Sequence, residues 1–177
     1  MKVIVITGMP GAGKEEFVSV ALSVGYEVVR MGDVVREWAS KQGLESNDKA
    51  VGRFANDERK RLGYDIWAKR CVERVRSSLT IIDGSRGLDE LRIFKNAFGE
   101  EVRLVAVHSS PRTRFQRLQR RGRADAPGSW EEFLERDLRE LSWGLGGLIA
   151  VADRMIINEG TLDEFRTSAL RYLQEQG

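Results

Sequence analysis

A glycine-rich segment near the start of the chain limits the possible folds more than any other feature. The apolar run Val3–Ile6 is followed by Gly8-Met9-Pro10-Gly11-Ala12-Gly13-Lys14, and then by residues with helical spacing. Glycines let the backbone curl so that successive N–H groups point at anionic oxygens, and the following helix directs its positive end to the same place. Lys14 adds a mobile cation for terminal phosphates. The alternative is a glycine-rich turn with an exposed lysine, but the flanking strand and helix favour a phosphate-binding loop for a nucleoside triphosphate.

One residue departs from the usual pattern of such a loop. The position after the lysine commonly holds Ser or Thr, whose hydroxyl binds magnesium, and here it holds Glu15. A carboxylate supplies the oxygen ligands that Mg²⁺ prefers, so Glu15 is a candidate metal ligand. The same negative charge would also repel phosphates, and the sequence leaves both interpretations open.

Strand-like and helical patterns alternate along the chain. The strand-like runs are Val3–Thr7, Tyr26–Arg30, Leu79–Asp83, Val102–Val107 and Met155–Ile157. This order predicts an α/β fold with a parallel sheet and helices on both faces. At 177 residues we expect a single domain, 1–177. The longest helical stretch, 33–77, breaks near Gly43–Asn47 and Gly63 into two or three helices, and an insertion there suits an acceptor-binding subdomain.

Two late helices have clear starts. Ser129 and Thr161 are each followed three residues later by a glutamate, Glu132 and Glu164, which is the pattern of a capping box. The first of these helices is predicted to carry an apolar face of Trp130, Phe133, Leu134, Leu138 and Leu141.

Acidic and basic residues follow the second and third predicted strands. Asp33 and Arg36 lie one helical turn apart at a strand-to-helix junction, where parallel sheets bind ligands. Arg36 is therefore placed to bind a second anionic group, although an N-cap aspartate with a surface arginine explains the pair equally well. Asp83 ends the third strand at a position that orients a metal ion in phosphate-loop proteins, and Arg86 follows it. An Asp-Gly turn is the alternative there.

Arginines are concentrated in residues 111–123, which contain six of them. Arg114, Arg117 and Arg121 share one helical face. Such a run is compatible with a solvated surface or an RNA-binding patch. Beside a phosphate loop, a lid whose guanidinium groups stabilise the charge of a transferring phosphoryl group is the stronger hypothesis. We therefore interpret residues 111–142 as an arginine-rich lid region.

Bulk composition argues against several classes of protein and of binding site. The net charge of +2 argues against a general nucleic-acid polycation. Cys71 is the only cysteine, so an intrachain disulfide is excluded, and no His/Cys cluster suggests a zinc site. The apolar windows are too short to span a membrane, and the first strand leaves no room for a signal peptide, so we expect a cytoplasmic protein. The sequence does not indicate the oligomeric state.

These motifs resemble a known family arrangement. Adenylate kinase and other nucleoside monophosphate kinases carry a phosphate loop, a Gly-Asp-x-x-Arg segment, an Asp-Gly-x-x-Arg segment and an arginine-rich lid. The matching segments here are Gly8–Glu15, Gly32–Arg36, Asp83–Arg86, which is one residue shorter, and Arg114–Arg123. Residues 152–165 are similar to the end of dephospho-coenzyme A kinase. Segments 31–36, 121–125 and 135–140 resemble an archaeal P-loop family described as adenylate-kinase-related.

The resemblance implies a three-layer α/β/α P-loop NTPase fold, whose five-stranded parallel sheet has the first strand central. It also implies roles for individual residues. Lys14 and the loop amides would hold the donor phosphates of ATP, with Mg²⁺ near Glu15 and Asp83. Arg86 and Arg36, with Asp33 beside it, would bind the phosphate of the acceptor. The remaining implied positions are the lid arginines Arg117, Arg121, Arg123 and Arg136, and the donor-base segment Asn158–Gly160 with Asn158 and Gly160 at its ends.

Three functions are consistent with the sequence. The leading one is an ATP-dependent phosphotransferase acting on a small phosphorylated acceptor, such as a nucleoside monophosphate or dephospho-coenzyme A. The second is a nucleotide-binding regulatory protein with weak ATPase activity, which Glu15 favours. The third is RNA binding through the arginine run, which we rank last.

Overall fold

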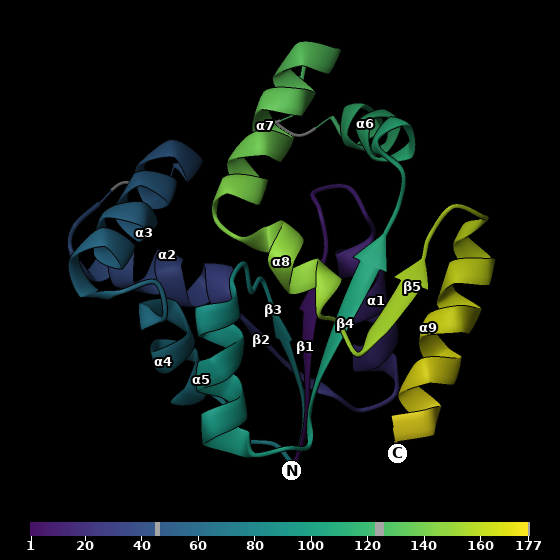
Figure 1. Ribbon diagram of the computed structural model, residues 1–177, viewed down its shortest axis with the longest axis horizontal. Coiled ribbons are helices and arrows are strands. Elements are labelled where there is room, and N and C mark those ends of the chain that lie inside the picture. The colour runs from purple at the N-terminus through teal and green to yellow at the C-terminus, as the bar shows by residue number, and fades with distance from the viewer. Residues whose placement is uncertain (45–46, 123–125, 177) are drawn as a thin grey trace.

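The computed structural model describes residues 1–44, 47–122 and 126–176, without the side chains of residues 48 and 49. These residues form one five-stranded sheet, in which all neighbouring strands pair in parallel and the order is β2-β3-β1-β4-β5 (Figure 1). The strands are β1 (Lys2–Thr7), β2 (Glu27–Arg30), β3 (Leu79–Asp83), β4 (Val102–His108) and β5 (Arg154–Ile157). The prediction of a five-stranded parallel sheet with the first strand central is confirmed, and each strand begins and ends within one residue of its predicted bounds.

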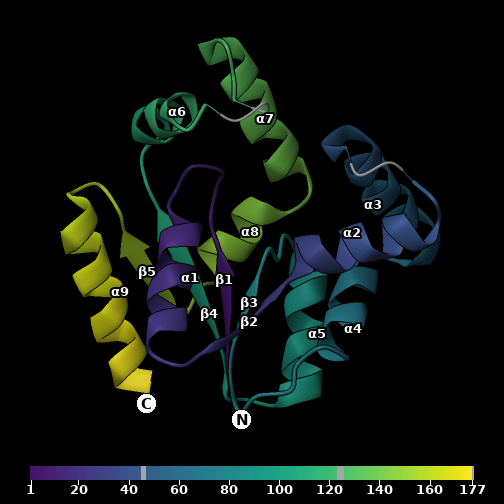
Figure 2. The ribbon, with the colours of Figure 1, turned by 180° about the vertical axis from the view of Figure 1, so that it is seen from behind.

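Helices cover both faces of this sheet. They are α1 (Lys14–Ser23), α2 (Met31–Lys41), α3 (Asp48–Leu62), α4 (Ile66–Val72), α5 (Leu88–Phe98), α6 (Pro111–Arg120), α7 (Trp130–Ser142), α8 (Leu145–Ala150) and α9 (Leu162–Gln176). Figure 2 shows α1 and α9 in front of one face, while Figure 1 shows α5 and α8 in front of the other. Over the described ranges, no helix combines the length and the apolar character needed to cross a membrane.

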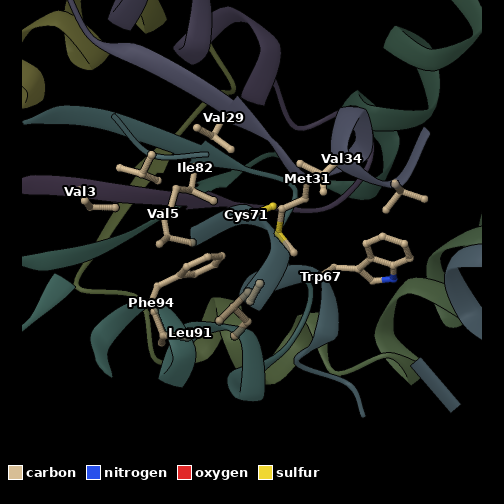
Figure 3. Packing of buried hydrophobic residues seen from close by; sticks show 14 of the residues in the cluster. Val3, Val5, Val29, Met31, Val34, Trp67, Cys71, Ile82, Leu91 and Phe94 are labelled. Atoms are coloured by element: carbon tan, nitrogen blue, oxygen red, sulfur yellow. The ribbon is translucent and has the colours of Figure 1, made fainter. Parts of the chain in front are cut away.

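The two cores follow from the alternation of side chains along β1. Val3 and Val5 point to the face covered by α4 and α5, whereas Ile4 and Ile6 point to the face covered by α1 and α9. Because parallel strands are buried on both faces, they are apolar throughout rather than alternating with polar residues. Figure 3 shows the first of these cores, in which Trp67 lies at one side of the cluster; its indole N–H donates to the Ala55 carbonyl of α3 at 3.0 Å.

The insertion between β2 and β3 folds into α2, α3 and α4, which break at the predicted glycines. A cation–aromatic stack holds these helices together. The Arg70 guanidinium lies 3.7 Å from the ring centroid of Trp38 and 4.6 Å from that of Trp67. Its NH2 group also donates to a Glu58 carboxylate oxygen at 2.6 Å. These contacts join all three helices, so the insertion is a packed unit and not a loose loop.

Helices α6 and α7 stand above the carboxyl ends of the strands (Figure 1). The predicted capping box at Thr161 forms: Thr161 Oγ1 accepts from the Glu164 N–H at 3.3 Å, and the Glu164 carboxylate accepts from the Thr161 N–H at 2.7 Å. At the start of α7, Ser129 Oγ accepts from the Glu132 N–H at 3.2 Å, but the Glu132 carboxylate accepts from the Gly128 N–H, one residue before the cap. The predicted apolar face of α7 is buried only in part. Phe133 is fully buried and packs against Phe115 of α6, with 5.5 Å between the ring centroids, but Leu138 is 66% exposed. Figure 1 shows that α7 begins beside α6, away from the sheet, and runs down toward α8.

Candidate functional site

A cavity of about 240 Å³ lies at the carboxyl ends of β1 and β3. Three segments far apart in the sequence form its wall: the glycine-rich loop, the residues after β3, and the α6–α8 region. The lining residues are Gly8, Pro10, Gly11, Gly13, Lys14, Glu15, Asp83, Gly84, Ser85, Arg86, Leu118, Arg121, Ala126, Arg136, Glu140 and Leu145. The structure therefore brings most of the predicted phosphate-site residues to one place. Met9 and Ala12 belong to the same loop but do not line the cavity.

The loop needs glycine where it passes close to other backbone and side chains. Gly8 has φ +146°, and a side chain there would meet the carbonyl oxygen of Val107 in β4. Gly13 has φ +112° and is the N-cap residue of α1, and a side chain there would meet the Asn158 amide. Since α1 begins directly at the loop, its positive end faces the cavity.

Lys14 is half-buried at the start of α1. Its Nζ donates to the carbonyl oxygen of Gly8 at 2.6 Å and lies 3.4 Å from that of Met9. Burial lowers the pKa of this ammonium, and the nearby Asp83 carboxylate opposes the shift. The lysine is thus held against the loop, where its charge reaches the cavity.

Asp83 carries an unsatisfied carboxylate oxygen. Its Oδ1 atom is buried and has no hydrogen-bond partner within the described part of the chain. Burial raises the pKa of this carboxyl, while Lys14 opposes the increase. An unpaired buried oxygen is costly unless something binds it, so Asp83 fits a role beside a hydrated cation.

Glu15 lies at the edge of the same cavity and is already paired. Its Oε1 accepts from the Arg30 guanidinium at 2.9 Å. Sequence reasoning missed Arg30, although its place at the end of β2 was the available signal. Among the described residues, no group of three His, Cys, Asp or Glu side chains could hold a metal by itself. A metal here would therefore need further ligands from water or from a bound phosphate.

The predicted arginines fall into different positions. Arg121 and Arg136 line the cavity. Arg86 lines it too, with its Nε 3.5 Å from a Glu140 oxygen. Arg117 does not line it: it donates to Ser109 Oγ at 2.8 Å and to Asn158 Oδ1 at 3.2 Å. Arg123 lies outside the described residues.

The buried side chain of Arg114 fastens the arginine-rich helix α6 to α7 and to the glycine-rich loop. Arg114 is 3% exposed, and its two terminal nitrogens donate to both oxygens of Asp137 in α7, at 2.8 and 2.5 Å. The same guanidinium donates to the carbonyl oxygens of Pro10 and Ser109, each at 3.2 Å. Helical spacing grouped Arg114 with Arg117 and Arg121 on one face but gave no sign of its partner Asp137, and Arg114 does not line the cavity.

The segment after β5 supports the loop from behind. Asn158 is buried, and its side-chain amide donates to the Ala12 carbonyl at 2.8 Å. The main-chain carbonyl of Asn158 accepts from Ser109 Oγ at 2.6 Å. Gly160 lies in the exposed turn before α9. Neither Asn158 nor Gly160 lines the cavity.

Asp33 and Arg36 form an exposed pair on the first turn of α2, with 2.5 Å between Asp33 Oδ1 and Arg36 NH2. The turn that carries them packs against the loop after β3, because a side chain added at Gly84 would lie 3.5 Å from Met31 Cβ. The pair therefore stands near the cavity, but it lines neither this cavity nor the next one.

A second cavity of about 260 Å³ adjoins the first and was not predicted. Its lining residues are Arg59, Tyr64, Arg86, Gly87, Leu88, Asp89, Glu90, Trp143, Gly144 and Gly147. Arg86 belongs to both cavities, and its guanidinium lies 4.8 Å from the Trp143 ring centroid.

The wall of the second cavity is organised by a buried carboxylate. Glu90 is 2% exposed and accepts from the Arg86 N–H at 2.7 Å and from Ser85 Oγ at 3.1 Å. It also pairs with Arg59 of α3 at 3.3 Å, where burial lowers the pKa of the guanidinium. Glu90 thus ties the insertion to the loop after β3.

A phosphate-binding loop at the switch from β1 to α1 and a cation-rich cavity above it define a P-loop protein with a kinase-like α/β fold. Solved structures share the fold across nearly their whole length. Shikimate kinase from Bacteroides thetaiotaomicron has a TM-score of 0.66 at 16% identity, covering 98% of this chain and 97% of that one. TT1252 from Thermus thermophilus has a TM-score of 0.65 at 19% identity, with coverage of 98% and 97%.

The sequence relatives identify the particular family. A family model described as "AAA domain" matches residues 7–133. A UPF0200 protein of Thermoplasma volcanium is 48% identical, covering 92% of this chain and 90% of the relative. A UPF0200 protein of Methanosarcina mazei is 41% identical, with coverage of 94% and 90%. The chain belongs to the UPF0200 family, and the resemblance to a P-loop family related to nucleotide kinases is confirmed. The phosphate-binding loop and the kinase-like fold support nucleotide binding.

Proposed function

We propose that the protein is an ATP-dependent phosphotransferase that moves the terminal phosphoryl group of ATP to a small phosphorylated acceptor, with a nucleoside monophosphate as the first candidate. The proposal is supported above all by two adjoining cavities that share Arg86. One cavity contains the phosphate-binding loop, and the other is flanked by aromatic rings. A donor phosphate and an acceptor phosphate bound in the two cavities would meet at one guanidinium.

The donor phosphates would lie against the glycine-rich loop. Lys14 would exchange its contact with the Gly8 carbonyl for phosphate oxygens, and the start of α1 would add its positive end. Arg86, Arg121 and Arg136 would offset the charge that spreads over the transferring group. Asn158 and Gly160 would adjoin the base of the nucleotide, as in the resembling kinases.

Magnesium, when bound, would neutralise charge between the phosphates of the donor. The unpaired Oδ1 of Asp83 fits this ion directly or through water. Glu15 would contribute only by leaving its pair with Arg30. Because these side chains alone are too few for six oxygen ligands, the metal would bind together with the nucleotide.

The acceptor would occupy the second cavity. Tyr64 and Trp143 offer flat surfaces on which a planar base can stack, and Arg59 with Arg86 would attract its phosphate. Residues 33–77 would then serve as the acceptor-binding insertion. Arg36 would join the acceptor phosphate by turning away from Asp33. Dephospho-coenzyme A, which also carries an adenine ring, is the alternative acceptor.

Residues 111–142 would act as the lid, which excludes water so that the phosphoryl group reaches the acceptor rather than water. Arg117 and Arg123 are further candidates for charge stabilisation. For Arg117 that role would require release from Ser109 and Asn158.

Direct phosphoryl transfer tests the proposal. The protein is incubated with ATP labelled in its terminal phosphate, Mg²⁺, and a panel of nucleoside monophosphates and dephospho-coenzyme A. We expect one acceptor to gain label, and Lys14→Ala to reduce the rate by about 100-fold. The matched control is Lys95→Ala, in the last turn of α5 at the opposite end of the sheet. The kinase proposal fails if no acceptor gains more label than with Lys14→Ala.

The Glu15–Arg30 pair favours the second candidate function, a nucleotide-binding regulatory protein with weak ATPase activity. A loop without the magnesium-binding hydroxyl would suit binding without fast transfer. The same assay separates the two functions. Release of labelled inorganic phosphate that depends on Lys14, with no labelled acceptor, would support the regulatory protein.

A further inference from the structure

The cavity beside the phosphate-binding loop has a negative charge at its edge that must be offset before a polyphosphate can bind. Glu15 lines this cavity and its side chain is 58% exposed. Its partner comes from another part of the sheet: Arg30 is the last residue of β2 and is the register partner of Asp83 in β3. Arg30 therefore stands at the carboxyl end of the sheet, next to Asp83 in the neighbouring strand, and its guanidinium lies 2.9 Å from the Glu15 carboxylate.

We propose that Arg30 is a positioning residue, which holds the Glu15 carboxylate at the edge of the cavity and offsets its charge so that the loop accepts a polyphosphate without the usual hydroxyl. The inference rests on the proposed nucleotide site. It explains how this loop carries Glu15 where the common pattern has Ser or Thr.

Electrostatics supports this role. Asp83 and Glu140 also line the cavity, so an unpaired Glu15 would be a third carboxylate facing an anionic ligand. Carboxylates that line one cavity repel an anion bound in it, even at an effective dielectric constant of about 20. Glu15 and Arg30 also act in opposite directions on the pKa of Asp83, which places both charges within electrostatic reach of the same point.

The pair is well suited to a test because it contributes little to the fold. The Arg30 side chain is 32% exposed and that of Glu15 is 58% exposed, and solvent-exposed ion pairs contribute little to the stability of a protein. Removing Arg30 should therefore leave the protein folded. The matched control is Arg74, which pairs with Glu37 at 2.7 Å on the insertion and is similarly exposed.

The experiment measures the Kd of ATP by calorimetry, once with EDTA and once with Mg²⁺, for the wild type and three variants: Arg30→Met, Glu15→Gln and the combined variant. We expect Arg30→Met to weaken ATP binding by about tenfold in EDTA, because the unpaired carboxylate then repels the phosphates. Magnesium should reduce this loss. The combined variant should bind within about twofold of Glu15→Gln, and Arg74→Met should match the wild type.

Two results would overturn the inference. Equal losses from Arg30→Met in the Glu15 and Glu15→Gln backgrounds would mean that Arg30 contacts the nucleotide directly. No loss in either background would mean that the ion pair is only a surface contact. Either result leaves the proposed phosphotransferase intact if an acceptor is labelled. Conversely, the expected pattern of affinities without a labelled acceptor supports the inference and removes the proposed function. A wild type that binds no ATP removes both.

Discussion

Replacing Asp137 by asparagine should destabilise the protein strongly although the side chain keeps its shape. The Arg114 guanidinium is held by both oxygens of Asp137 at 2.8 and 2.5 Å, and these residues are only 3% and 8% exposed. Asparagine keeps one acceptor but removes the countercharge. The result is a buried cation that is no longer neutralised, and the cost comes mainly from that uncompensated charge.

The magnitude follows from the geometry. Two unit charges about 4 Å apart attract by about 4 kcal/mol at an effective dielectric constant of about 20. The remaining acceptors of Arg114, the carbonyl oxygens of Pro10 and Ser109, recover a fraction of this, so we expect a loss of about 3 kcal/mol in the free energy of unfolding. With a urea m value of about 2 kcal/mol/M, the midpoint should fall by about 1.5 M at unchanged m.

Urea unfolding followed by tryptophan fluorescence measures this shift. The control is Asp163→Asn, whose carboxylate is 93% exposed and lies 3.8 Å from Arg166. That variant should lose less than about 1 kcal/mol. The apolar double replacement Arg114→Met with Asp137→Leu should regain much of the stability lost in Asp137→Asn. Equal midpoints for Asp137→Asn and Asp163→Asn would refute the reasoning.

Three further outcomes are expected. Burial raises the pKa of Asp83 above its ordinary 3.8. This carboxyl should therefore lower the free energy of unfolding as pH rises from about 4 through the raised pKa, because the unfolded chain ionises first. Asp83→Asn should therefore gain in free energy of unfolding over the wild type across that interval, and a pH-independent difference would contradict this. Gly8→Ala should lower the free energy of unfolding by about 2 kcal/mol more than Gly25→Ala, because Gly25 also has a positive φ but has open space around it. Equal decreases in melting temperature for the two variants would contradict this expectation. Arg70→Met should lower the free energy of unfolding in urea by about 2 kcal/mol, whereas the exposed Arg92→Met should change it little. The stacking argument fails if both variants unfold at the same urea concentration.

The fold was predictable because its signals are local. Each strand is a short apolar run, and the alternation of Val3 and Val5 with Ile4 and Ile6 fits a sheet covered on both faces. The capping boxes gave the starts of α7 and α9 for the same reason. Burial was less predictable: helical periodicity identified the apolar face of α7, but whether Leu138 meets another element depends on where the helix stands relative to the sheet.

The candidate site was predictable to the extent that the carboxyl ends of parallel strands meet at one edge. That rule and the loop motif together placed Lys14, Asp83 and Arg86 at one cavity. The contacts made by side chains across elements carry no such signal. Nothing in the spacing of Arg30 and Glu15, or of Arg59 and Glu90, indicates that these residues touch, because each pair joins segments whose approach is set by the whole fold.

Arg86 would couple the binding of a ligand in one cavity to the binding of a ligand in the other. Its guanidinium lies 4.8 Å from the Trp143 ring centroid in the second cavity, and Arg86 also lines the first cavity together with the glycine-rich loop. A ligand in one cavity that draws the guanidinium toward itself would change the affinity of the other cavity for its own ligand. By thermodynamic linkage, the second ligand would change the affinity for the first by the same factor. Cooperativity between the two ligands would thus pass through one side chain, without any movement of the sheet.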